Sequence, residues 1–102
     1  MLYAIKLTYI SSAEQIREHL DAHKGWLIKY IGSANVLFAG PLMDKSGGFI
    51  LAHAHQLSDI QKIMNEDPFV AHRLVSLDII ECDPAIRSTD FAARWAENAQ
   101  SI

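Results

Sequence analysis

The chain is 102 residues long, which fits one domain with a single hydrophobic core. Half of its residues are hydrophobic and its formal net charge is −3, which excludes a disordered polyelectrolyte. Its nine Lys and Arg residues are scattered along the chain, so no nucleic-acid partner is expected. Because a domain of this size buries limited surface on its own, we expect a homodimer or a higher homo-oligomer.

Cysteine content and hydropathy indicate a cytoplasmic location. Cys82 is the single cysteine, which excludes an intrachain disulfide and a cysteine-based metal framework. We expect it to be a small buried hydrophobe in a strand. The apolar N-terminus lacks a basic leader and carries Lys6 where a signal peptide needs apolar residues. No segment approaches the roughly 20 apolar residues that span a bilayer, so no membrane partner is expected.

The first third of the chain predicts a strand and a long helix. Apolar and polar residues alternate over residues 2–10, as in a strand that buries mainly one face. Apolar residues then recur three and four positions apart, which predicts a helix over residues 12–31. Gly32 is expected to end this helix in the left-handed conformation. Its start has two candidate capping boxes, Ser12 with Gln15 and Ser11 with Glu14.

The next part of the chain predicts a hairpin, a second helix and a final strand. Residues 36–40 and 49–55 are short apolar runs, close enough along the chain to form an antiparallel hairpin. Gly40-Pro41 closes the first run, because proline cannot donate a hydrogen bond to a strand ladder. Ser58 is expected to open the second helix. Residues 75–82 supply the fourth strand.

These elements follow the order βαββαβ, which predicts a ferredoxin-like α+β fold with both helices on one face of an antiparallel sheet. The other face of the sheet needs a cover, and we expect a second copy of the chain to provide it. The predicted domain spans residues 1–83. Residues 84–102 form a C-terminal helical extension, in which residues 90–97 predict an amphipathic helix with Phe91 and Trp95 one turn apart. We expect this helix to dock on a neighbouring subunit.

His23 is the first candidate for chemistry, because it is a titratable group within an apolar helical stripe. It shares a helix face with Leu20 and Leu27, so its ring is expected to point toward the sheet. Burial makes such a ring costly to charge unless a carboxylate lies nearby. A neutral core histidine that bonds a backbone carbonyl is the alternative. His19 and His72 are expected on the surface or at a rim.

Asp67, in the segment Asp67-Pro68-Phe69, is the expected partner of His23. By itself, this aspartate is typical of the N-cap of a short helical turn whose first residue is Pro68. The two roles are compatible, because a capping carboxylate has a second oxygen that can orient an imidazole. A histidine and a carboxylate form a common general-base pair, in which the carboxylate fixes the tautomer of the ring.

Other residues that could bind a metal or a ligand also have purely structural explanations. His53 and His55 stand two apart in a predicted strand, so both rings emerge on one face and could begin a metal site. No third ligand is near them in the sequence, and no metal is expected. Gly40-Pro41 and Gly47-Gly48 flank a loop that could cover a ligand, although turn geometry also explains them. The chain has no phosphate loop and no dinucleotide fingerprint, so no cofactor is expected.

The order of several short motifs resembles the YciI-like (YCII-related) family over residues 1 to 83. The motifs are His23, Ala39-Gly40-Pro41, Gly47-Gly48-Phe49, Asp67-Pro68-Phe69 and a final strand that ends near Glu81. The resemblance implies a ferredoxin-like, dimeric α+β barrel whose cleft holds a histidine and an aspartate suspected to be catalytic. Those positions fall on His23 and Asp67. The extension after residue 84 departs from the shortest members of the family.

The resemblance also implies a similarity to small-molecule lyases and dehalogenating enzymes that act on aromatic or dicarbonyl-like compounds. We therefore expect an enzyme that binds a small apolar or aromatic substrate and abstracts a proton from it. His23 is the expected base and Asp67 its orienting partner, with backbone amides around Gly40 stabilising an oxyanion. A non-catalytic module that binds a metabolite or another protein is the alternative. The expected substrate-binding residues are Gly40, Pro41 and Phe69.

Overall fold

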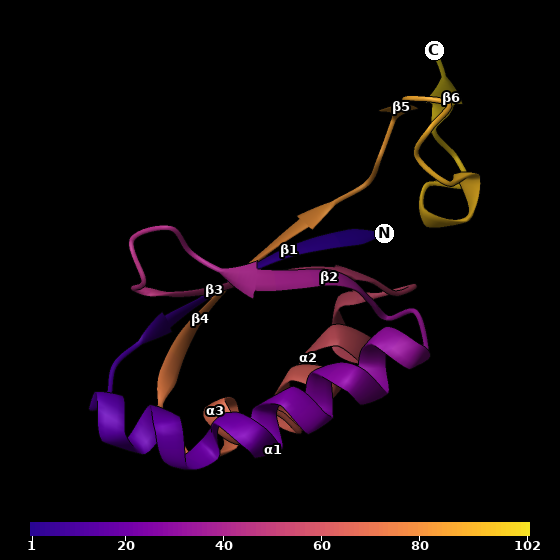
Figure 1. The fold of residues 1–102 in the computed structure, drawn as a ribbon. Coiled ribbons are helices and arrows are strands. Elements are labelled where there is room, and N and C mark those ends of the chain that lie inside the picture. The colour runs from indigo at the N-terminus through magenta and orange to yellow at the C-terminus, as the bar shows by residue number, and fades with distance from the viewer.

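The computed structural model describes residues 1–102 and has an α+β architecture (Figure 1). A four-stranded antiparallel sheet has the strand order β2-β3-β1-β4, and the helices lie on one of its faces. The predicted ferredoxin-like α+β fold is confirmed. None of the helices combines the length and the apolar composition that crossing a membrane requires. The elements are β1 (Leu2–Tyr9), α1 (Ala13–Gly32), β2 (Val36–Pro41), β3 (Gly47–His53), α2 (Leu57–Asn65), α3 (Pro68–Ala71) and β4 (Val75–Cys82).

The hydrophobic core lies between the sheet and the helices, with β1 at its centre. β1 pairs with β3 along one edge and with β4 along the other. Its alternate residues Tyr3, Ile5 and Leu7 are buried in the core, so the expected burial of one face of this strand is confirmed. Because successive side chains in a strand point to opposite faces, the residues between them lie on the face without helices.

Apolar side chains also cross the face of the sheet that no helix covers. The strand register opposes Phe38 to Leu51, Leu51 to Ala4, and Ala4 to Ile80, so these residues form one row across the sheet, which we call the outer stripe. Phe38 is 53% exposed and Ile80 is 65% exposed. Cys82 lies on the same face and is exposed. Its predicted burial is wrong because nothing covers this face within one chain.

α1 begins as predicted but ends differently. Ser12 is its N-cap, and the Ser12 hydroxyl accepts a hydrogen bond from the N–H three residues later at 3.2 Å. The helix continues through Gly32, and the residue with a left-handed backbone is Ala34, at φ 63°. The Ser33 hydroxyl donates to the Asn35 side chain at 2.7 Å. This local bond stabilises the turn without a glycine cap.

The hairpin and β4 match the prediction, although β2 ends one residue later, at Pro41, and β3 begins two residues earlier, at Gly47. β2 and β3 pair antiparallel, and β4 spans the expected residues. β3 ends at His53, so His55 lies beyond the strand, where the chain bends toward α2. α2 begins at Leu57 with Gln56 as its N-cap, instead of at Ser58. The expectation that both histidines emerge from one strand is therefore wrong.

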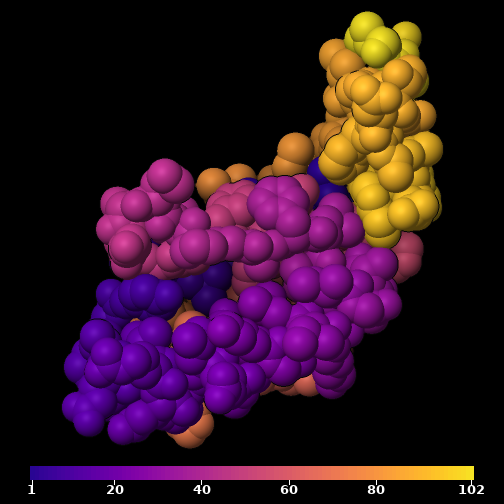
Figure 2. Space-filling view, viewed as in Figure 1, coloured from indigo at the N-terminus to yellow at the C-terminus, as the bar shows by residue number.

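The C-terminal extension is not an α-helix, which corrects the prediction for residues 90–97. It projects as an arm beyond β4 (Figure 1, Figure 2) and contains two short parallel strands, β5 (Ile86–Arg87) and β6 (Gln100–Ser101). A helix of this length is marginal without a packing partner, and the segment retains only a 3₁₀ turn at Ala93–Trp95. The Trp95 ring packs edge-on against His53, with ring centroids 5.4 Å apart. Docking of the arm on a neighbouring subunit stays a prediction.

The close approach of β1 to β3 at Gly47 gives a test of this packing. A Cβ at Gly47 would lie 1.7 Å from the carbonyl oxygen of Leu7, which cannot move without separating the two strands. We expect Gly47→Ala to lower the free energy of unfolding by about 1–3 kcal/mol.

Gly25→Ala is the matched control for this substitution. A Cβ at Gly25 meets nothing within 4 Å, and alanine stabilises the interior of a helix by about 0.5–1 kcal/mol relative to glycine. Urea unfolding of the two variants should therefore give changes of opposite sign. An unchanged midpoint in Gly47→Ala would contradict the strand spacing described here.

Candidate active site

His23 and Asp67 lie in contact, although 44 positions separate them in the chain. Nδ1 of His23 is 2.7 Å from Oδ1 of Asp67, a hydrogen-bonding distance. The His23 side chain is 13% exposed, so the ring is nearly enclosed but not sealed. Nε2 has no hydrogen-bond partner in the protein and is not a buried atom. It is therefore the ring nitrogen that a ligand can reach.

A short local turn holds Asp67 in place. Asp67 is the N-cap of α3, with Pro68 at the start of the helix, as predicted. Its Oδ1 accepts the N–H of Phe69 at 3.0 Å and also faces Nδ1 of His23. One oxygen thus fills both roles, whereas the sequence favoured one oxygen for each. The carboxyl group is fully buried and its Oδ2 has no partner in the protein.

Aromatic side chains fix the plane of the His23 ring. Phe69 stacks on it, with ring centroids 4.0 Å apart and planes 8° from parallel. Trp26 lies 5.8 Å from the His23 ring at an interplanar angle of 27°, and Tyr9 meets Phe69 edge-on at 6.2 Å. Because Phe69 also donates its N–H to Asp67, a single short segment supplies both the carboxyl group and the stacking ring.

His23 forms part of the wall of a cavity of about 370 Å³ between α1 and the β2–β3 edge of the sheet. This volume is at the lower end of the range typical of small-molecule sites. Gly40, Pro41 and Phe69, which were predicted to bind a ligand, all line the cavity. Asp67 does not, because it lies behind the His23 ring. The apolar part of the wall includes Leu7, Leu20, Leu27 and Ile50.

Tyr9 and Lys24 also line the cavity, and the sequence reasoning missed both. A signal for each was present. Tyr9 continues the alternation that buries Leu7 and the residues before it. Lys24 follows Leu20 by four positions and precedes Leu27 by three, which puts these residues on one side of a helix.

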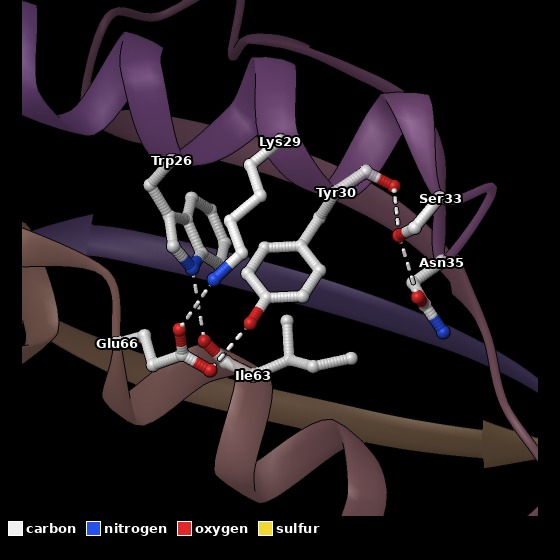
Figure 3. A network of polar contacts seen from close by, with 7 residues as sticks. All are labelled: Trp26, Lys29, Tyr30, Ser33, Asn35, Ile63 and Glu66. Atoms are coloured by element: carbon white, nitrogen blue, oxygen red, sulfur yellow. Dashed lines mark hydrogen bonds and ion pairs between the residues drawn. The ribbon is translucent and has the colours of Figure 1, made fainter.

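A polar cluster at the N-terminal side of α3 joins α1 to the α2–α3 turn (Figure 3). Glu66 accepts hydrogen bonds from the Tyr30 hydroxyl and from Nζ of Lys29, the latter at 3.1 Å. The indole N–H of Trp26 donates to the carbonyl oxygen of Ile63 at 2.9 Å. We call these residues the elbow cluster. The hydrogen bonds, that from Tyr30 first, lower the pKa of Glu66 below its ordinary value.

The other histidines lie outside the cavity wall. His53 packs on Trp95, and its pKa is lowered, mainly by burial and then by the nearby N-terminus and His55. His19 is half-buried and His72 is exposed, as expected for residues at a rim and on the surface, and their rings lie 4.3 Å apart. No group of three or more His, Cys, Asp or Glu residues is arranged to hold a metal ion.

Comparisons with known proteins agree with this fold. A family model described as the YCII-related domain matches residues 1–94, whereas no curated protein matches the chain. Among solved structures, the chain is similar to 5-chloro-2-hydroxyhydroquinone dehydrochlorinase (TftG) from Burkholderia phenoliruptrix AC1100 in complex with 2,5-dihydroxybenzoquinone. The TM-score is 0.68 at 21% sequence identity, over 83% of this chain and 96% of that one. At this identity the likeness concerns the fold.

The elbow cluster predicts a specific pH dependence of stability. Because the pKa of Glu66 is lower in the folded chain than its ordinary value of 4.5, the carboxylate stabilises the fold above that value. Its contribution is lost as the pH falls through the lowered pKa. We expect Glu66→Gln to reduce the loss of stability as the pH falls below about 5, measured as urea midpoints.

Glu18→Gln is the control for Glu66→Gln, because it removes the same charge from an exposed residue of α1 whose side chain makes no hydrogen bond or ion pair. The urea midpoint of this control should follow the wild-type pH dependence. A Glu66→Gln curve that is superimposable on the wild-type curve would show that the elbow cluster does not persist in solution.

Proposed function

The chain belongs to the YCII-related family, and we propose that it is a small-molecule lyase in which His23 abstracts a proton from a ligand in the cavity. Asp67 orients the ring. The observation that carries the proposal is that His23 lines the cavity while its Nε2, on the far side of the ring from the nitrogen that Asp67 engages, has no partner in the protein. The cytoplasmic location expected from the sequence stays a prediction.

The contacts of His23 suit a general base. When Nδ1 carries the hydrogen that it donates to Asp67, Nε2 is the unprotonated nitrogen. After Nε2 takes a proton, the positive charge of the ring lies 2.7 Å from a fully buried carboxyl oxygen. Burial strengthens this attraction relative to water. The stacked Phe69 restricts rotation of the ring, so Nε2 stays directed at the cavity.

An elimination fits a cavity with one base and few other reactive groups. Nε2 of His23 would remove a proton from a carbon activated by an adjacent carbonyl group or electron-poor ring. The electrons of that C–H bond form a new π bond, and a leaving group departs from the neighbouring carbon with its bonding pair. Backbone amides around Gly40 remain the predicted donors to an oxyanion.

The structural neighbour supports this reaction class and suggests a ligand class. That protein is named as a dehydrochlorinase acting on a chlorinated hydroxyhydroquinone, and its structure holds a dihydroxybenzoquinone. A substituted six-membered ring of this kind is also compatible with a cavity of about 370 Å³. We infer that this chain acts on a small aromatic or quinone-like compound.

We also propose that the chain forms a homodimer through the outer stripe. Phe38 and Ile80 are more than half exposed at opposite edges of the sheet, with Leu51 and Ala4 between them. An antiparallel sheet that is apolar on both faces needs two covers, and closed two-fold dimers are the commonest oligomers. A second copy presents the same row and so matches it. The result would be the dimeric α+β barrel expected from the family resemblance.

His23→Ala tests the proposed base. We expect it to lower turnover by about 10²- to 10⁴-fold, the usual contribution of a general base. Release of chloride from 5-chloro-2-hydroxyhydroquinone, the substrate in the neighbour's name, is the assay, and circular dichroism checks the fold. A wild-type protein that releases no chloride would contradict the dehydrochlorinase reading. A loss below about tenfold in His23→Ala would show that His23 is not the base.

Asp67→Asn is the companion variant, because it separates charge from position. An asparagine oxygen can still accept the N–H of Phe69 and the hydrogen of His23 Nδ1, whereas the negative charge is lost. We expect kcat to fall by a smaller factor than in His23→Ala, with little change in KM, because the charge matters after the proton has moved. Equal activity of Asp67→Asn and wild type would show that the carboxylate charge has no part in turnover.

Ile80→Asp tests the proposed dimer. A charge in the outer stripe should disrupt a buried apolar interface, so we expect the mass to fall toward that of the 11.4 kDa monomer. Ile28→Asp is the control, because Ile28 is 71% exposed on α1 and lies outside the outer stripe. Sedimentation equilibrium at micromolar concentration measures both. A monomeric wild-type protein, or equal effects of the two variants, would contradict the interface.

A further inference from the structure

The polar side chains of the cavity wall include one lysine and no acid. They are those of Tyr9, His23 and Lys24, and no carboxyl group lines the cavity. Asp67, which bonds His23, is fully buried and is not part of the wall. The cavity therefore combines an apolar surface with positive charge, although the chain as a whole carries a net charge of −3. A ligand that complements this wall has an apolar body and an anionic group.

Lys24 is a cation without a protein partner. It is exposed on α1, and the ion pairs of the structure are His23 with Asp67 and Lys29 with Glu66. Lys29, on the same helix, forms an ion pair and gives a comparison, since its Nζ lies 3.1 Å from a carboxylate oxygen of Glu66. Lys24 has no such contact and lies at a cavity, so its ammonium group is available to a ligand.

We propose that the cavity selects small, largely apolar molecules that carry an anionic oxygen group, and that Lys24 is the residue that recognises this group. The assignment rests on the lyase function proposed above and names its substrate class. A carboxylate, a phenolate or an ionised enol has the required chemistry. The volume of about 370 Å³ limits the ligand to a body of roughly one ring with small substituents.

An anion held by Lys24 also orients the ligand. The ammonium group fixes the charged end, and the apolar side chains of Leu20, Leu27 and Phe69 are left to contact the body. A carbon atom of that body, and not the anionic group, can then face Nε2 of His23. Solvent screens an ion pair less when apolar walls partly enclose it. One lysine is therefore enough to distinguish an anionic ligand from a neutral ligand.

Binding of benzoate and benzamide to the full chain tests the proposal. The two molecules share a planar ring and nearly the same shape, and only benzoate is charged. Backbone amide resonances of the cavity residues follow each titration by NMR. We expect benzoate to bind about fivefold or more tightly than benzamide, as for one partly screened ion pair. The preference should decline as the salt concentration rises.

Substitutions assign the preference to a residue. Lys24→Met removes the charge but keeps the apolar stem, so it should abolish the preference without weakening benzamide binding, and Lys24→Arg should retain the preference. Lys62→Met is the matched control, because it removes the same charge from an exposed residue of α2 outside the cavity wall. His23→Ala should also retain the preference, which excludes pairing of the anion with a protonated imidazole.

The outcomes separate this proposal from the proposed function. Equal binding of the two ligands, or a preference that survives Lys24→Met, overturns the role of Lys24 and leaves the lyase chemistry intact. Failure of both ligands to bind in the cavity overturns the proposal together with the small-molecule site. A His23→Ala protein that keeps both its benzoate preference and full turnover supports the role of Lys24 and overturns the proposed base.

Discussion

One carboxyl oxygen organises the candidate site. Oδ1 of Asp67 accepts the Phe69 N–H at the start of α3 and bonds the His23 ring on α1, so a single atom joins two helices that are distant in the sequence. The carboxyl group is fully buried and its other oxygen has no protein partner. A buried polar group that loses a partner costs about 1–3 kcal/mol. Moving the His23 ring would remove a hydrogen-bond partner from this buried carboxyl group, and the cost of that loss keeps the ring in place.

The elbow cluster extends this constraint along the chain. Glu66 directly precedes Asp67 and is bonded to Lys29 and Tyr30 of α1, while Trp26 bonds the end of α2. These bonds involve residues that precede the N-cap of α3, and the Phe69 ring stacks on His23 after it. α3 therefore contacts α1 on both sides of its N-cap. Each exposed bond contributes little to stability. Together they restrict movement of a turn whose displacement would separate the two groups of the site.

Local chemistry decides which of these features the sequence could predict. The alternation of apolar and polar residues in the sequence predicts the first strand, and the proline after Asp67 predicts the start of a helix. The pairing of this aspartate with His23 rests on family resemblance, because no local pattern links residues 44 positions apart. Residues 90–97 have the spacing of an amphipathic helix, but the arm lacks the contacts that would stabilise one. The free charge of Lys24 is likewise invisible in sequence, since it depends on which carboxylates approach it in space.

Charge balance connects the base, the buried carboxylate and the cavity lysine. Once His23 has taken a proton, the site holds two cations, on His23 and on Lys24, near an apolar wall where like charges repel more strongly than in water. Asp67 pairs with the first at 2.7 Å, and no acid of the chain pairs with the second. A neutral ligand would leave one cation uncompensated during proton transfer, whereas an anionic ligand completes a second pair. This repulsion appears only as the proton moves. An anionic substrate should therefore have a higher kcat, as well as a lower KM, than a neutral substrate of the same shape.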